Sequence, residues 1–313
     1  MSKRVLVVSS MVCLAALAYT AGRQSADAAP ASSPVVAADD HSGHGDNAAP
    51  SASTSASTSA QQAMNIPAGA ATVAARLTAS PRHGEWTKIA VPGMDSIMAY
   101  VVYPQRRDNA PVVVVIHEIY GLSTWVRGVA DQLAADGFIA ISPDLISIER
   151  GGATTDTIET QRASQLIRAV TPDKMNAMVT AVGKYGMSLP AARRVYGVVG
   201  FCWGGAAVFN HVVANPDGLK GGVVYYGTAP PAEQMKAIKV PVLGQYGESD
   251  ARVTAPVPGV DSTMKALGKS YQFEIFAGAA HGFVRAQDVA ANAAATAKSW
   301  PTVLAFFRKN LGT

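Results

Sequence analysis

Apolar stretches alternate with polar ones along the chain from about residue 87 to its end. Residues 111–117 form a continuously apolar run, which is typical of a strand covered on both faces. Residues 125–136 have the spacing of an amphipathic helix, and Gly137 is placed to end it. Strands that alternate with helices form a mostly parallel sheet with helices on both faces. The pattern therefore predicts an α/β fold.

The same pattern places the other elements. We expect strands at residues 87–91, 97–103, 111–117, 138–142, 195–201, 222–226, 240–246 and 271–276, the first two as an antiparallel pair. We expect helices at residues 125–136, 172–185, 205–213 and 286–308. In open parallel sheets the active site lies beyond the carboxyl ends of the strands, so the residues that follow these strands are the candidates for chemistry.

Residues 1–28 have the features of a secretory signal peptide. Two basic residues precede an apolar run at residues 5–17, which is too short for a stable membrane span. Residues 26–28 then provide a cleavage site of the small-x-small type. We therefore expect a periplasmic or secreted protein with no stable membrane insertion after signal removal. The alternative is that the signal is retained as an anchor.

Residues 29–80 are predicted to be a disordered linker. The segment consists largely of small and polar residues, and residues 51–60 are of low complexity. It holds too few large apolar side chains to offset the conformational entropy of folding. The globular domain is therefore expected at residues 81–313, which is long enough for one sizeable core.

Charge and cysteine content narrow the class of partner. The 313-residue chain has a formal charge of +4, and loss of residues 1–28 removes three basic residues and one acidic residue, which leaves +2. A nearly neutral domain without a basic block gives no reason to expect nucleic acid as a partner. We expect a monomer with a small-molecule partner. The exported chain keeps Cys202 as its single cysteine, so it can form no internal disulfide.

The strongest chemical signal is the motif Gly-Phe-Cys-Trp-Gly at residues 200–204. It follows a β-branched strand and leads into a helix, which is the setting of a nucleophile elbow with cysteine in place of serine. The two glycines allow a turn so sharp that side chains there would clash with neighbouring backbone. The turn places Cys202 at a helix N-terminus, which favours a thiolate and supplies a backbone N–H for an oxyanion.

A thiol nucleophile needs a base, and the base needs an orienting acid. Two histidines follow Cys202 in the chain. His211 lies inside the helix after the elbow, where a structural role is expected, whereas His281 lies in the loop after a predicted strand. Asp250 follows the preceding strand at the usual position of the acid, and Glu248 is the fallback. The predicted triad is therefore Cys202, Asp250 and His281.

Glu118 ends the apolar run at residues 111–117 and can face the cysteine. In a dry pocket this carboxylate could withdraw the proton of the thiol. The preceding His117 is not followed by a second histidine at the spacing of a zinc helix. We therefore expect no metal and no other cofactor.

Together these motifs resemble the dienelactone hydrolase family, whose members have the α/β-hydrolase fold. The resemblance covers about residues 86–311 and rests on HEIYG at 117–121, SPDL at 142–145, GFCWGG at 200–205, YGESD at 246–250 and HGFVR at 281–285. It implies a carboxylic ester hydrolase whose cysteine attacks a lactone carbonyl to form an acyl-cysteine. It further implies that Glu118 activates the thiol when substrate arrives, and that the backbones of Ile119 and Trp203 are the oxyanion donors.

The resemblance also implies residues that bind substrate. Two arginines hold the substrate carboxylate in the best-known members, and Arg285 matches one of them. Arg162 is the candidate for the other, and Tyr120 is expected beside the pocket. For either arginine a solvated surface position is the alternative.

Three functions stay open at this point. The first is hydrolysis of lactones or small activated esters through the Cys-His-Asp triad. The second is a broad-specificity esterase or cysteine peptidase on the same fold, because the fold does not fix function. The third is a non-catalytic binding protein. A small closed pocket that holds Arg285 would favour small anionic lactones, and a long open groove would favour peptides.

Overall fold

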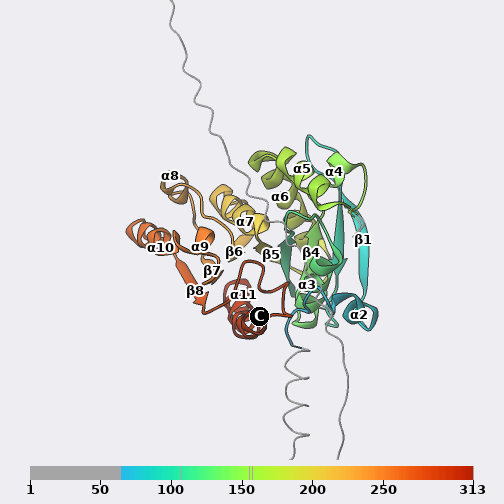
Figure 1. Cartoon of the computed structure of the whole chain (residues 1–313). Coiled ribbons are helices and arrows are strands. Elements are labelled where there is room, and N and C mark those ends of the chain that lie inside the picture. Colours follow the sequence, from blue (N-terminus) through green and yellow to red (C-terminus); the bar gives the residue numbers. More distant parts are fainter. Residues whose placement is uncertain (1–64, 107, 155, 157, 313) are drawn as a thin grey trace, which may run out of the picture. The chain divides into compact units, whose positions relative to one another are not determined.

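The computed structural model describes residues 65–312 apart from 107, 155 and 157 (Figure 1). The predicted signal at residues 1–28 and the linker up to residue 64 lie outside the described residues, so both stay predictions from the sequence. In the part of the chain that is described, none of the helices is long and apolar enough to span a membrane.

Eight strands form one sheet in the order β1-β2-β4-β3-β5-β6-β7-β8. The neighbours from β4 to β8 pair in parallel, whereas β1 and β2 form an antiparallel pair and β2 joins β4 antiparallel. The strands are β1 (Gly84–Ile89), β2 (Ile97–Val102), β3 (Ala110–Ile116), β4 (Ile139–Pro143), β5 (Ala192–Phe201), β6 (Leu219–Tyr225), β7 (Val242–Gly247) and β8 (Tyr271–Phe276). The structure confirms the predicted antiparallel pair of strands at the start of the domain and the predicted parallel strands after it.

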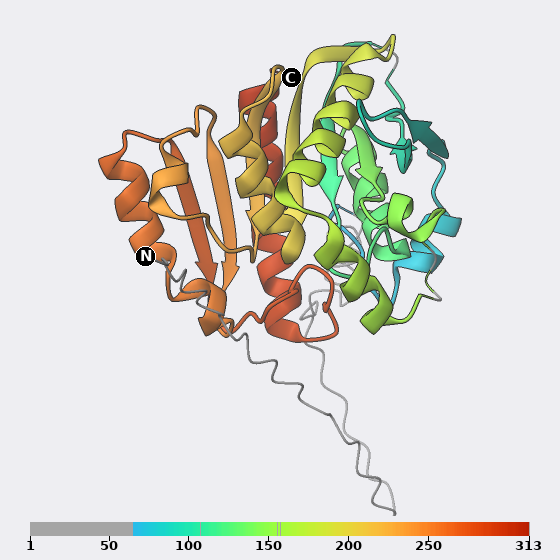
Figure 2. The same ribbon diagram turned by 90° about the horizontal axis from the view of Figure 1, so that it is seen from above.

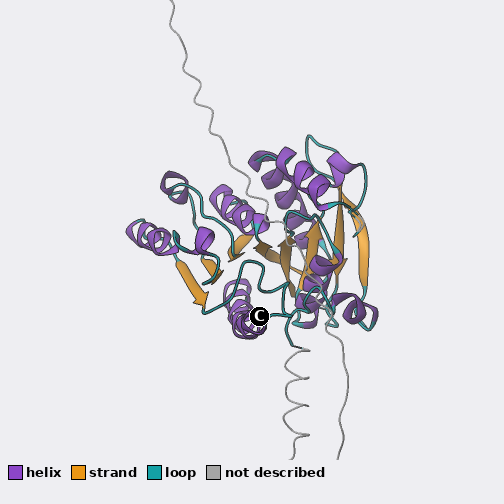
Figure 3. Cartoon of the chain, viewed as in Figure 1, coloured by secondary structure: helices purple, strands orange, loops and turns teal. Residues whose placement is uncertain are grey.

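Helices cover both faces of this sheet, as Figures 2 and 3 show. The described helices are α2 (Val73–Thr78), α3 (Thr124–Ala135), α4 (Ser147–Arg150), α5 (Thr160–Ala169), α6 (Pro172–Ser188), α7 (Trp203–Ala214), α8 (Ala232–Met235), α9 (Ala251–Thr254), α10 (Val257–Ala266) and α11 (Ala290–Leu311). Helices α6 and α7 pack on one face, and α3 and α11 pack on the other. Every residue of β3 is buried, as its unbroken apolar run predicts.

The domain begins earlier than the sequence predicts. We predicted a linker up to residue 80, but residues 65–79 include α2 and pack against α3. Val73 is buried there, and Ile66 and Leu77 pack against the core on the α3 face. These three apolar side chains are enough to dock a short segment onto an existing surface, although they could not form a core of their own.

Two helix glycines test this docking. A Cβ at Gly128 in α3 would lie 2.1 Å from Val73, whereas nothing lies within 4 Å of a Cβ at Gly259 in α10. Both Gly→Ala changes gain about 0.5–1 kcal/mol of backbone entropy, but Gly128→Ala also forces Val73 away. We expect Gly259→Ala to raise the free energy of unfolding in urea. The free energy of unfolding of Gly128→Ala should be lower than that of Gly259→Ala by about 1–3 kcal/mol. Equal gains in the two variants would contradict the docking of α2.

Candidate active site

Cys202 lies in a sharp turn between β5 and α7. Its backbone has φ 57° and ψ −116°, a conformation that residues other than glycine rarely adopt. A Cβ at Gly200 would lie 2.1 Å from the carbonyl oxygen of Gly204. A Cβ at Gly204 would lie 2.5 Å from the carbonyl oxygen of Ile116. The flanking glycines therefore let α7 begin directly against the end of β3.

The loops after β7 and β8 bring Asp250 and His281 together. The Nδ1–H of His281 donates to Oδ2 of Asp250 over 2.5 Å, and the Asp250 side chain is only 8% exposed. Glu248, the fallback acid, instead accepts a hydrogen bond from the backbone of Gly278. The imidazole is thus oriented by Asp250. The other histidine after the elbow, His211, is buried in α7 against the Tyr196 hydroxyl.

Glu118 follows β3 and is buried beside the elbow. Its Oε2 lies 3.6 Å from Nε of Arg285, and neither atom has a hydrogen-bond partner. Burial raises the pKa of the Glu118 carboxyl to about 7, although the charge of Arg285 acts in the opposite direction. Arg285 also stacks over the ring of Tyr120, with 4.6 Å between Cζ and the ring centroid. The carboxylate is therefore poised between its charged and neutral forms near neutral pH.

The Cys202 thiol is protonated at rest. Burial, followed by the negative charge of Glu118, raises its pKa to about 11, and the backbone N–H of Trp203 only partly offsets this rise. The sequence predicted a thiolate, because the thiol sits at a helix N-terminus. Loss of hydration and a neighbouring carboxylate outweigh that effect here.

His117 fixes the peptide that follows Glu118, a role that the sequence analysis missed. The imidazole is buried, its Nε2 accepts from the backbone N–H of Leu145, and its Nδ1–H donates to the carbonyl of Glu118 over 2.7 Å. In a trans peptide the N–H points away from the carbonyl. The N–H of Ile119 therefore points away from His117. The SPDL motif, which contains Leu145, was the available signal.

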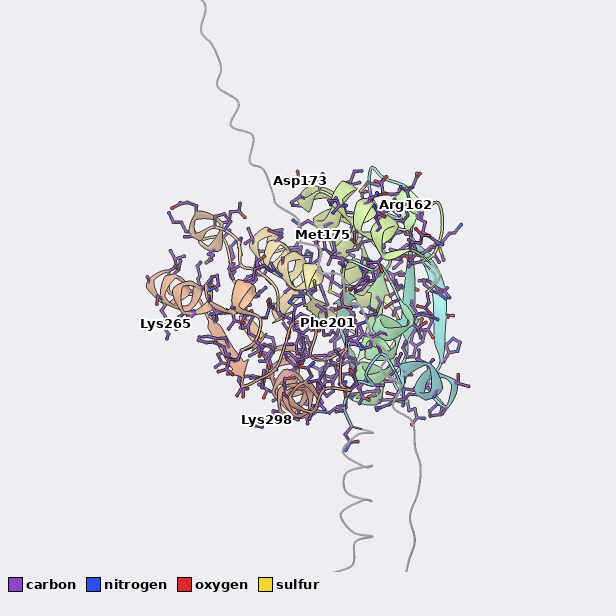
Figure 4. The ribbon with its side chains drawn as sticks, viewed as in Figure 1. Arg162, Asp173, Met175, Phe201, Lys265 and Lys298 are labelled. Atoms are coloured by element: carbon purple, nitrogen blue, oxygen red, sulfur yellow. The ribbon has the colours of Figure 1, made fainter. Side chains whose placement is uncertain are left out.

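The two arginines do not share a site. Arg285 and Tyr120 line a cavity of about 480 Å³ between α2 and the start of α3. Arg162 is exposed on α5 and lines a separate surface hollow with its own neighbours on that helix. Figure 4 shows Arg162 at the periphery, away from Phe201, which directly precedes Cys202. The structure therefore does not bring Arg162 to the cavity that Arg285 lines, and its role in substrate binding stays a prediction.

Comparison with known proteins identifies the family. The model of the dienelactone hydrolase family matches residues 97–311, which is most of the chain. This chain belongs to the dienelactone hydrolase family. The match spans the elbow, Glu118, Asp250 and His281, and it confirms the predicted resemblance and the carboxylic ester hydrolase class.

Relatives and solved structures of dienelactone hydrolases agree with this assignment. The chain is 30% identical over 199 residues to a carboxymethylenebutenolidase homolog of Mus musculus, a match that covers 61% of this chain and 77% of that protein. It is 27% identical over 257 residues to a predicted carboxymethylenebutenolidase of Salmonella typhimurium, with 78% and 90% covered.

Solved structures show the same fold. A dienelactone hydrolase-type structure from Klebsiella pneumoniae matches with a TM-score of 0.63 at 23% identity, covering 72% of this chain and 99% of that one. A promiscuous phosphotriesterase of dienelactone hydrolase type from metagenomic libraries matches with a TM-score of 0.62 at 19% identity, covering 74% and 99%. The predicted α/β-hydrolase architecture is confirmed.

The thiol environment of this dienelactone hydrolase family member predicts how iodoacetamide labels Cys202. Because the charge of Glu118 raises the pKa of the thiol, Glu118→Gln should lower it and increase the thiolate fraction. Above pH 7 the Cys202 peptide should be labelled faster in Glu118→Gln than in the wild type, by about tenfold for each unit by which the pKa of the thiol falls. Mass spectrometry of the labelled peptide measures the rate. The difference should vanish as the pH falls well below 7, where Glu118 in the wild type becomes neutral.

Glu248→Gln is the matched control, since Glu248 is an exposed glutamate that also follows a strand. It should label at the wild-type rate at every pH. Equal rates for Glu118→Gln and Glu248→Gln at pH 8 would contradict the assigned effect of Glu118.

Proposed function

We propose that this protein hydrolyses lactones or small activated carboxylic esters through a triad of Cys202, His281 and Asp250 and an acyl-cysteine intermediate. Glu118 takes the proton of the thiol, and Arg285 binds a carboxylate on the substrate. The observation that carries the proposal is the contact between Arg285 and Glu118 beside a protonated, half-buried thiol. A resting enzyme of this kind is protected from modification until a substrate arrives.

The electrostatics support activation by substrate. The charge of Arg285 lowers the pKa of Glu118. A substrate carboxylate that pairs with Arg285 offsets this charge, so the pKa of Glu118 rises and the carboxylate becomes a stronger base. The proton then moves from the Cys202 thiol to Glu118, and partial burial makes the resulting thiolate reactive because water solvates it only in part.

The chemistry then proceeds in two halves. The thiolate attacks the ester carbonyl carbon, and the backbone N–H groups of Ile119 and Trp203 stabilise the oxyanion. The carbon–oxygen bond breaks, and the leaving oxygen takes the proton that Glu118 accepted. His281 next takes a proton from water, the hydroxide attacks the thioester carbon, and the carbon–sulfur bond breaks. The thiolate recovers the proton from His281, so ester and water have become acid and alcohol.

The pocket favours a small substrate over a peptide. The cavity beside Arg285 has a volume of about 480 Å³, which is within the range of small-molecule sites. The Glu118 carboxylate is buried next to Arg285, and a substrate with a negative charge of its own can pair with this arginine. Hydrolysis of small anionic lactones is therefore the function that this geometry supports best.

Loss of the nucleophile tests the mechanism. Cys202→Ala should remove hydrolysis of all lactones and p-nitrophenyl esters that the wild type cleaves, because no thioester can form. The melting temperature should stay close to that of the wild type, since the change removes one sulfur atom. Cys202→Ser keeps the geometry and should retain only weak turnover. Full activity of Cys202→Ala on any such substrate would overturn the proposal.

Substrate charge tests the role of Arg285. Arg285→Ala should lower kcat/KM for a butenolide that carries a carboxylate by about tenfold to a hundredfold, as expected for a lost charged hydrogen bond. The corresponding butenolide amide should be affected much less. Arg162→Ala is the control, because Arg162 is an exposed arginine outside this cavity. Equal losses on the acid and the amide would remove Arg285 from carboxylate binding.

A further inference from the structure

The segment of residues 65–79 precedes the part of the chain that matches the family, which begins at residue 97. It is nevertheless fastened to α3. The indole N–H of Trp125 donates to the carbonyl of Ala68 over 3.2 Å. Arg76 donates to the side chain of Gln132 over 2.5 Å, and Val73 fills the space above Gly128. The segment is therefore a fixed part of the domain surface.

The same segment is fastened to the loop that carries Arg285. The backbone N–H of Ala70 donates to the carbonyl oxygen of Arg285 over 2.8 Å. The amide of Gln287, two residues further on, donates to the carbonyl of Pro67 over 2.8 Å. Residues 65–79 thus bridge α3 and the arginine loop of the active site.

The space between these attachments is the cavity of about 480 Å³. Ala70, Val73 and Ala74 form its wall on the α2 side, and Tyr120 and Arg285 form its wall on the side of the active site. Because Arg285 lies 3.6 Å from Glu118, the cavity begins one side chain away from the proposed base.

We propose that this cavity binds the part of the substrate remote from the ester carbonyl, and that α2 sets the size of the group admitted. This inference rests on the proposed function, because it concerns the substrate of that site. The group that fits is an uncharged ring, aromatic or alicyclic, attached to the lactone or ester.

The charges around the cavity support an uncharged ring. Asp156 accepts hydrogen bonds from the backbone and the hydroxyl of Thr124 and lies 3.9 Å from Arg127. Arg285 faces Glu118. The charge of Asp156 is therefore opposed by partners within the protein, and Arg285 is the group proposed to bind the substrate carboxylate. The α2 wall consists of small apolar side chains against which a ring can pack.

Two neighbouring alanines of α2 provide the test. Both are exposed, but Ala74 lines the cavity and Ala75 is not part of its lining. Ala74→Trp fills the cavity from its wall, whereas Ala75→Trp makes the same change in the same helix elsewhere. The substrates are δ-valerolactone and dihydrocoumarin, which share the six-membered lactone and differ by a fused benzene ring.

We expect Ala74→Trp to lower kcat/KM for dihydrocoumarin by about tenfold, mainly through KM, because ground-state binding of the ring is lost. In the same variant, kcat/KM for δ-valerolactone should stay within about twofold of the wild-type value. Ala75→Trp should leave both substrates unchanged, and both variants should melt at similar temperatures. Equal effects of the two variants, or equal losses on both substrates, would overturn the inference.

Binding gives a second readout that does not depend on turnover. Calorimetry with 3-(2-hydroxyphenyl)propanoate, the product of dihydrocoumarin, should show weaker binding to Ala74→Trp than to Ala75→Trp. If the wild type hydrolyses neither these lactones nor the butenolide that carries a carboxylate, the proposed function fails, while this difference in binding still supports the cavity. If the product binds both variants equally, the inference fails whatever the turnover.

Discussion

The contact of the start of α7 with the end of β3 is the constraint on which the active site depends. Gly204 reaches the carbonyl oxygen of Ile116 so closely that no side chain fits between them. This approach forces the strained backbone of Cys202, and it places the thiol beside Glu118, the second residue after β3. Two parallel neighbours, β3 and β5, therefore place the proposed nucleophile and its proposed base side by side. A rigid sheet can hold such strain because the strands on either side over-determine the turn.

Because Cys202 and Glu118 lie so close together, a negative charge on Glu118 disfavours a negative charge on the thiol. Burial raises the pKa values of both Cys202 and Glu118, and the negative charge of Glu118 raises the pKa of the thiol further. Arg285 is the third charge, and it is 36% exposed, so it is the member of the group that an incoming anion can reach. The distribution of one proton between sulfur and carboxylate thus depends on what Arg285 faces. The charge of Asp250 also raises the pKa of the thiol, to a smaller extent than Glu118. The hydrogen bond between Asp250 and His281 fixes the imidazole.

Much of this could be predicted from the sequence, for reasons that particular residues make clear. Apolar runs such as β3 and the second half of β5 are typical of buried strands. A Gly-x-Cys-x-Gly motif between a strand and a helix is typical of a nucleophile elbow, so the sheet and the elbow were predictable. Asp250 and His281 follow from chain order. The packing of residues 65–79 was not predictable, because Ile66, Val73 and Leu77 lie in a stretch of small residues and have a partner only once α3 exists. The protonated thiol depends on burial, which no local pattern records, and the outward position of Arg162 depends on the rotation of α5.

Because α2 is attached to the surface of the domain, the proposed selection of substrate size and the proposed chemistry depend on different parts of the chain. Glu118, Cys202, Asp250 and His281 all follow the ends of strands, so a change to one of these strands would disturb the chemistry proposed for them. The wall of the cavity instead belongs to a short segment held by Trp125 and by the carbonyl of Arg285. Such a segment can vary in length and side-chain size while the sheet stays intact, because surface connections tolerate change that core strands do not. Its hydrogen bond to Arg285 also ties the size of the admitted group to the position of the charged side chain. In the function that we propose, one connected piece of structure therefore recognises both the shape and the charge of the substrate, while residues that follow the strands carry out the chemistry.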